Sequence, residues 1–303
     1  MKLMRLLVSG GAGFIGLSLV KRLILDGHEV VSYDLRPSPM GESIIGDITD
    51  EEAFSKAVKS CEHVFHLAAA ADLNWCSAHP NEAVKANIKG TRVVAEECAK
   101  RGITLSFAST CCVYGDTPDH PSDEESICSP TDIYGATKFV GEELIKGYQR
   151  KMGLNYHLLR FGTTYGPGMR PTLAIYIFIQ QALQDKQLTL HGSGEQTRCM
   201  IYIDDIVEAC VKTLKLDHYI MGTTLNIATD EELSVWQMAN MILKLTVRPL
   251  TQYVHVPDRF GQIMKEQIDI SKARKMLDWE PKTSFREGLL KTIEWIKPHL
   301  SVI

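Results

Sequence analysis

The chain lacks the features that mark membrane-spanning, nucleic-acid-binding or secreted proteins. No stretch of about 20 apolar residues is present, so no membrane-spanning helix is expected. The net charge is −4 and the Lys and Arg residues are scattered, which argues against a nucleic-acid-binding face. The N-terminus passes at once into an apolar strand-like segment rather than a leader, so we expect a cytoplasmic protein.

Paired metal-binding cysteines are also missing. The eight cysteines form no CxxC pair, and no His/Cys cluster has the spacing of a zinc site. Cys111 and Cys112 are adjacent, which is a poor geometry for a structural disulfide. We therefore predict reduced thiols and no metal. The 303 residues, 45% of them apolar, are enough for one or two closely joined domains.

A glycine-rich turn near the N-terminus is the first informative pattern. An apolar strand over residues 3–8 leads into glycines at positions 10, 13 and 16 and then into a helix that ends near Gly27. Gly10 allows the positive φ of a tight turn, Gly13 lets the backbone approach a pyrophosphate, and Gly16 lets the helix pack against the strand. The free N–H groups of the helix start would bind the phosphates. The pattern predicts a dinucleotide site.

The next strand, residues 29–34, ends in a carboxylate about 20 residues after the glycines. Asp34 there is placed to bind the adenosine ribose and to repel a 2′-phosphate, which favours NAD over NADP. Arg36 weakens this preference, because a nearby arginine can accept a 2′-phosphate. Asp47 follows another short strand and is either an adenine contact or an acid that caps a turn or helix.

Strand-like and helix-like segments alternate over the first half of the chain. Such alternation predicts an α/β fold with a doubly wound parallel Rossmann sheet. Gly166-Pro167-Gly168 interrupts it, so we divide the chain into an NAD-binding domain at 1–166 and a smaller mixed α/β substrate domain at 167–303. A strand at 225–228 is expected to return to the main sheet. Helices are predicted at 80–100, 133–152, 173–185, 204–215, 234–245 and 286–297. Strands are predicted at 63–67, 103–109 and 156–161.

A proton-transfer site is predicted at the start of the helix over 133–152. Tyr134 and Lys138 lie four residues apart and share one helix face. A tyrosine titrates near pH 10, but a lysine ammonium and the positive ring of an oxidised nicotinamide favour its phenolate, which makes Tyr134 a candidate base. Thr110 ends the preceding strand and can hold the substrate oxygen. Taken alone, such a pair is more often a surface contact, but the glycine turn upstream and Thr110 at a strand end favour the proton-transfer site.

Several motifs together resemble the extended short-chain dehydrogenase/reductase family and its nucleotide-sugar epimerase/dehydratase group. They are Gly10–Gly16, His66-Leu67-Ala68-Ala69, Asn87-Ile88-Lys89-Gly90-Thr91, Ser109-Thr110 with Val113-Tyr114-Gly115, Tyr134-Gly135-Ala136-Thr137-Lys138, Tyr165-Gly166-Pro167 and Gly192–Arg198. The resemblance implies that Thr110, Tyr134 and Lys138 are catalytic and that Lys138 also holds the nicotinamide ribose. It extends the cofactor contacts to Phe14, Ile15, Ile48, Leu67, Ala68 and Ala69, and it implies a homodimer formed through the helices at 80–100 and 133–152.

The second half of the chain is similar to the segment that binds the nucleotide diphosphate in this group. By this likeness Arg198 and Arg259 contact the diphosphate and Thr163 contacts the substrate; a surface loop for Arg198 and an ion pair with Asp258 for Arg259 are the alternatives. The chain departs from the group where Thr163 replaces a frequent Asn and where Cys199, not Asp, follows Arg198.

Four interpretations fit these motifs. We favour an NAD-dependent nucleotide-sugar 4-epimerase, because no acid follows Thr110 where the group's 4,6-dehydratases and uronate decarboxylases carry one. Those two reactions are the first alternative. An NAD(P)-dependent carbonyl reductase and a non-catalytic dinucleotide-binding protein are the others; retention of Tyr134 and Lys138 argues against the last. The nucleotide, the sugar and the inverted carbon stay open.

Overall fold

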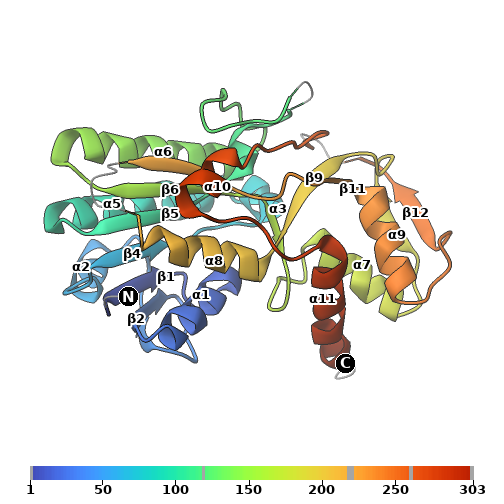
Figure 1. Ribbon diagram of the computed structural model, residues 1–303, viewed down its shortest axis with the longest axis horizontal. Coiled ribbons are helices and arrows are strands. Elements are labelled where there is room, and N and C mark those ends of the chain that lie inside the picture. The colour runs from blue at the N-terminus through green and yellow to red at the C-terminus, as the bar shows by residue number, and fades with distance from the viewer. Residues whose placement is uncertain (1–2, 118–119, 217–221, 259–261, 301–303) are drawn as a thin grey trace.

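A seven-stranded parallel sheet forms the centre of the computed structural model, which describes residues 3–117, 120–216, 222–258 and 262–300 (Figure 1). Its strand order is β10-β6-β5-β4-β1-β2-β3, which is the doubly wound arrangement predicted from the sequence. The strands are β1 (Arg5–Ser9), β2 (Glu29–Asp34), β3 (Glu42–Ile45), β4 (His63–His66), β5 (Thr104–Thr110), β6 (Tyr156–Phe161) and β10 (Thr223–Ile227).

Helices cover both faces of this sheet, and the alternation of side chains along the strands separates two cores. Leu6 and Val8 of β1 point into the core shared with α1 and α8, whereas Leu7 between them points into the core shared with α5 and α6. Figure 1 shows α1 and α8 on one side and α2, α5 and α6 on the other. The helices are α1 (Phe14–Leu25), α2 (Glu51–Ala57), α5 (Gly90–Arg101), α6 (Ile133–Met152), α8 (Ile203–Thr213) and α10 (Ser271–Leu277).

A smaller mixed α/β part lies beside the carboxyl ends of the large sheet (Figure 1). It contains a three-stranded sheet, in the order β11-β9-β7, and a parallel pair of β12 with β8. Its strands are β7 (Thr163–Tyr165), β8 (Leu188–His191), β9 (Thr197–Tyr202), β11 (Glu232–Ser234) and β12 (Tyr253–Val256), and its helices are α7 (Ala174–Leu183), α9 (Val235–Leu245) and α11 (Phe285–Leu300). The division at residue 166 remains our proposal. Two segments after this boundary pack with the first part, since β10 pairs with β6 and α8 packs on α1.

The helix predicted over 80–100 is interrupted. It follows α3 (Leu73–Ala78) and consists of α4 (Pro80–Val84), a π-helical turn (Lys85–Lys89) and α5. Such a wide turn inserts one extra residue into the ladder and is frequent at functional sites. Here it brings Lys85 and Ala86 to the wall of the cleft described below.

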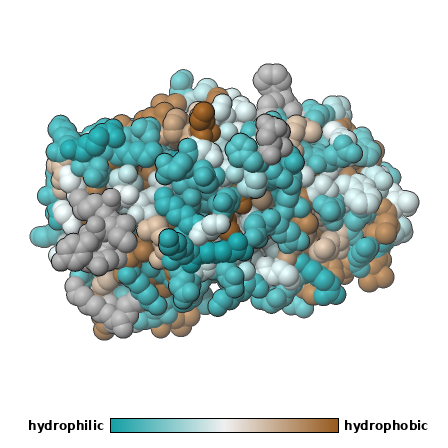
Figure 2. All heavy atoms as spheres, turned by 45° about the horizontal axis from the view of Figure 1, so that its top comes forward, coloured by the Kyte–Doolittle hydropathy of each residue, from teal (hydrophilic) through white to brown (hydrophobic). Residues whose placement is uncertain are grey.

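The surface mixes hydrophilic and apolar residues. On the face in Figure 2, hydrophilic residues predominate and apolar residues occur in scattered groups. No helix among the described residues is long and apolar enough to cross a membrane. On the helices predicted to form the dimer, Val93, Val94 and Ile145 are buried in the core of the subunit itself, while Val84 and Val140 are exposed. The dimer remains a prediction. Fewer apolar side chains on these helices are exposed for a dimer contact than their sequences alone suggest.

Candidate functional site

A cleft of about 950 Å³ opens where the strand order reverses between β1 and β4. Ligands of open α/β sheets bind at this position. Every residue that the sequence assigned to the cofactor lines the cleft: Gly10, Gly13, Phe14, Ile15, Gly16, Asp34, Asp47, Ile48, Leu67, Ala68, Ala69, Tyr134 and Lys138. Thr110 and Thr163 line it as well, so one cavity joins the glycine turn to the candidate proton-transfer residues.

The glycine turn after β1 has no room for side chains. Gly10 has φ +75°, and a Cβ there would lie 2.7 Å from the backbone nitrogen of Ala68. A Cβ on Gly16 would lie 2.0 Å from the carbonyl oxygen of Gly10, so this glycine is what lets α1 pack against the turn. No side chain caps the N-terminus of α1. Its first N–H groups are therefore available to an anion, and the turn fits the pyrophosphate of a dinucleotide.

Asp34 lies at the end of β2 beside this turn. Its carboxylate accepts hydrogen bonds from the backbone N–H groups of Ala12 (3.1 Å) and Arg36 (3.1 Å), which hold it against the cleft. The Arg36 guanidinium donates to the Ala12 carbonyl at 3.4 Å and also lines the cleft. Both groups that decide between NAD and NADP thus lie at the same rim.

Asp47 has a structural role in addition to its place in the cleft. Its Oδ1 accepts hydrogen bonds from the backbone N–H and the hydroxyl of Thr49, both at 2.9 Å. The backbone hydrogen bond from Thr49 is the main reason that the pKa of Asp47 is lowered. The turn-acid alternative is realised, and the contact with adenine remains a proposal for the other oxygen.

Lys138 is the most buried member of the candidate catalytic group. It lies on α6, whose first turn is fixed by Asp132 accepting the N–H of Gly135 at 2.8 Å. The Lys138 ammonium lies 3.9 Å from the centre of the Phe107 ring. Burial lowers the pKa of Lys138 to about 7, and Glu142, one helical turn further, opposes this. The charge of Lys138 therefore depends on what fills the cleft.

A cation that the sequence did not point to lies near Tyr134. Burial raises the pKa of Tyr134, and the positive charge of Arg170 opposes this shift. Arg170 lines the cleft and donates to the carbonyl of Ala71 at 3.0 Å. Sequence reasoning missed it because Arg170 follows the Gly166-Pro167-Gly168 break and carries no motif of its own. A positive group bound in the cleft would oppose the effect of burial and favour the phenolate.

Thr110 lies where β5 ends, beside two cysteines. Its hydroxyl oxygen accepts the N–H of Cys112 at 3.2 Å and retains its own hydrogen for another acceptor. Burial raises the pKa of Cys112 to about 12 and also raises that of Cys111. Thiols of such high pKa are weak proton donors and are not ionised at physiological pH, so neither replaces the acid that is missing after Thr110.

Asn87 and Glu142 hold the surroundings of this group. Asn87 accepts the N–H of Ala70 at 2.8 Å and donates to the hydroxyl of Thr137 at 2.9 Å, which ties the loop after β4 to α6. Glu142 forms a buried ion pair with Arg160 at 2.7 Å. These contacts position α6 and thereby Tyr134 and Lys138.

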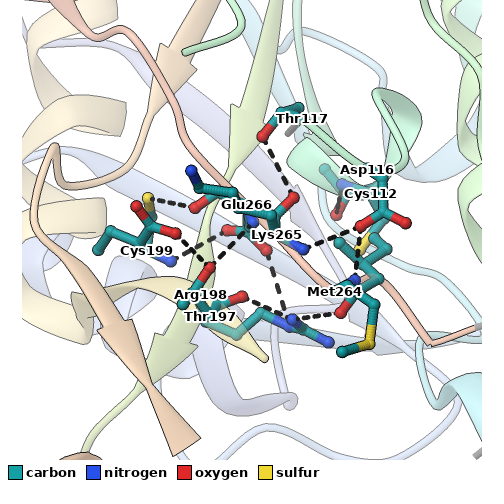
Figure 3. A network of polar contacts seen from close by, with 12 residues as sticks. Cys112, Asp116, Thr117, Thr197, Arg198, Cys199, Met264, Lys265 and Glu266 are labelled. Carbon is teal, nitrogen blue, oxygen red and sulfur yellow. Dashed lines mark hydrogen bonds and ion pairs between the residues drawn. The ribbon is translucent and has the colours of Figure 1, made fainter. Parts of the chain in front are cut away.

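The predicted diphosphate arginine, Arg198, lies on β9 just outside the cleft wall. One guanidinium nitrogen donates to the carbonyls of Thr197 (2.6 Å) and Ile263 (2.8 Å), and its Nε lies 3.9 Å from the Glu266 carboxylate (Figure 3). Glu266, not Arg198, is among the residues that line the cleft. Arg259 lies outside the described residues. The role of Arg198 toward a diphosphate therefore remains a proposal, and it requires the side chain to turn from these carbonyls.

Comparisons with known proteins agree with this geometry. Residues 6–228 match the model of the NAD dependent epimerase/dehydratase family. The chain is 34% identical to an uncharacterized UDP-glucose epimerase of Bacillus subtilis (97% of this chain, 98% of the relative). It is 32% identical to a UDP-N-acetyl-alpha-D-glucosaminuronate decarboxylase of Bacillus cytotoxicus (97% and 98%). The structure of UDP-glucuronic acid 4-epimerase from Bacillus cereus, in complex with UDP-glucuronic acid and NAD, superposes with a TM-score of 0.91 at 30% identity (98% and 100%).

Proposed function

Because the chain belongs to the NAD-dependent epimerase/dehydratase family, we propose that it is a nucleotide-sugar 4-epimerase that acts through a 4-keto sugar. The observation that carries the proposal is the meeting of Thr110, Tyr134 and Lys138 with the glycine turn in one cleft. A hydroxyl held between Thr110 and Tyr134 would lie beside a cofactor whose phosphates rest on α1. This arrangement serves oxidation of a hydroxyl-bearing carbon.

The side chains divide the work as follows. A bound NAD would supply the acceptor for the hydride of the sugar carbon and the donor for its return. Tyr134 removes the proton of the C4 hydroxyl, Thr110 orients that oxygen, and Lys138 supports the phenolate and holds the nicotinamide ribose. Thr163, Arg198 and Arg259 are the proposed substrate contacts. They anchor the nucleotide while the keto sugar rotates and presents its opposite face to the cofactor. Tyr134 then returns the proton.

A 4,6-dehydratase or a uronate decarboxylase is the second candidate. Relatives named as an epimerase and as a decarboxylase lie at nearly the same distance from this chain. Both alternative reactions need chemistry beyond oxidation at C4. The neutral thiols of Cys111 and Cys112 support the epimerase, whereas Glu266 favours the alternative because it brings a carboxyl to the cleft from a distant segment.

The test is incubation of the purified protein with UDP-, dTDP-, GDP- and CDP-sugars, followed by NMR of the products. A C4-inverted sugar supports the proposal, and a dehydrated or decarboxylated product supports the second candidate. A reductase must exchange its cofactor at every turnover, whereas an epimerase regenerates it. Retention of NAD through chromatography therefore argues against the carbonyl reductase. We also propose a cytoplasmic homodimer.

A further inference from the structure

Glu266 belongs to an irregular segment, residues 262–270, that precedes α10, and Figure 3 shows the contacts of this segment. On one side the Asp116 carboxylate accepts the N–H groups of Met264 (2.5 Å) and Lys265 (2.9 Å). On the other side the N–H of Thr197, on β9, donates to the carbonyl of Met264 at 3.0 Å. The backbone on both sides thus fixes where the Glu266 side chain begins.

The Glu266 carboxyl is buried and only partly satisfied. The residue is 3% exposed, yet it lines the cleft together with Thr110, Cys112 and Tyr134. One oxygen accepts the N–H of Cys199 at 3.3 Å, and the other lies 3.9 Å from the Nε of Arg198. A carboxylate has room for about four hydrogen bonds, so acceptor capacity is left for a molecule in the cleft.

The charges around this carboxyl come from four elements. Arg198 and Cys199 face it from β9, and Cys111 and Cys112 face it from the turn after β5. Glu232 on β11 and Asp116 bind the neighbouring residues Thr197, Met264 and Lys265. The thiols are neutral and the Nε of Arg198 lies 3.9 Å away, beyond hydrogen-bond distance, so the negative charge of Glu266 is incompletely compensated. Burial raises the pKa of Glu266 to about 7, against the opposing effect of Arg198.

We propose that Glu266 is a specificity residue that accepts sugar hydroxyls and selects nucleotide sugars with an uncharged C6 over nucleotide uronates. The inference rests on the proposed function and narrows its substrate class. A uronate would bring a second carboxylate into the same low-dielectric cleft, where like charges cannot both be retained. Glu266 must then take up a proton, which costs about tenfold in affinity for each pH unit above 7. A neutral hexose needs no such proton.

The test compares kcat/KM for UDP-glucose and UDP-glucuronic acid between pH 6 and 9. In the wild type, the uronate-to-hexose ratio should fall by up to about tenfold per pH unit above 7. In Glu266→Gln, which keeps the shape but has no charge, the ratio should be independent of pH and at least tenfold higher at pH 8.5. Glu232→Gln is the matched control, because this neighbouring carboxyl is not among the cleft-lining residues, and the pH slope should persist.

Three results would overturn the proposal: the same slope in Glu266→Gln, a wild-type preference for the uronate at pH 8.5, or a dehydrated or decarboxylated product that Glu266→Gln no longer forms. Calorimetry on the wild type alone gives a second reading. In buffers of different ionisation enthalpy at pH 8, UDP-glucuronic acid should bind with uptake of more protons than UDP-glucose, and equal uptake refutes the role. This binding measurement can be made even if no sugar is turned over. Absence of turnover would refute the proposed function, whereas equal proton uptake would refute the role of Glu266.

Discussion

Gly16→Ala should destroy the cofactor site, and the magnitude follows from the packing of α1. The new Cβ would lie 2.0 Å from the carbonyl oxygen and 2.7 Å from the carbonyl carbon of Gly10. These are backbone atoms of the turn itself, so the strain cannot be relieved by rotating a side chain. Overpacking of this kind costs about 1–3 kcal/mol, and we expect the upper end. For a chain of 303 residues, 3 kcal/mol corresponds to a fall in melting temperature of roughly 5 °C.

The same change should abolish stabilisation by the cofactor. NAD at about 100 times its dissociation constant stabilises the wild type by about 2.7 kcal/mol, and Gly16→Ala should lose most of this increment. Gly147→Ala is the matched control, because a Cβ there meets nothing within 4 Å on α6. It removes a helix-interior glycine and should gain up to about 1 kcal/mol with an unchanged response to NAD. Thermal unfolding with and without NAD measures all of these effects, and wild-type behaviour of Gly16→Ala would refute the reasoning.

Three further substitutions address the chemistry. Tyr134→Phe should abolish turnover by removing the base while NAD binding by calorimetry stays nearly unchanged; near wild-type kinetics would exclude Tyr134 as the base. Asp34→Ala should weaken NAD and relax discrimination against NADP in binding titrations, because the carboxylate held by Ala12 and Arg36 is lost; a wild-type preference for NADP would shift the role to Arg36. Arg198→Ala should raise KM for the nucleotide sugar roughly ten- to a hundred-fold with little change in NAD affinity, as one charge-assisted contact of about 1.5–3 kcal/mol is removed. An unchanged KM would mean that Arg198 only holds the carbonyls of Thr197 and Ile263.

The fold and the cofactor half of the site were predictable because their signals are local. The strand Glu29–Asp34 and the helix Ile133–Met152 occur at the residues predicted, since each is bounded by its own turn or capping residues. The family model and the doubly wound sheet confirm the predicted fold and the membership of an NAD-dependent family. The smaller sheets were not predicted, because three- and four-residue strands such as β7 and β12 carry little periodicity.

The residues that were missed reach the cleft through tertiary structure. Glu266 lies in a polar stretch, Lys265-Glu266-Gln267, that is typical of an exposed loop, yet it is buried where the neighbouring Met264 and Lys265 pair with Thr197 and Asp116. Arg170 influences Tyr134 across the cleft without proximity in sequence. The lowered pKa of Lys138 depends on its burial against Phe107, which the spacing of Tyr134 and Lys138 does not reveal.

The late return of β10 to the large sheet has a consequence for the nascent chain. While the ribosome synthesises the segment from β7 to α8, the buried strand β6 has no partner strand on the edge that β10 later occupies. At about 5–20 residues per second this open edge persists for several seconds, and unpaired apolar edges recruit other strands. A fragment that stops at residue 166 would retain this edge permanently. The nucleotide-binding half is therefore expected to aggregate when expressed alone, and it becomes a stable unit only after residue 227 has been added.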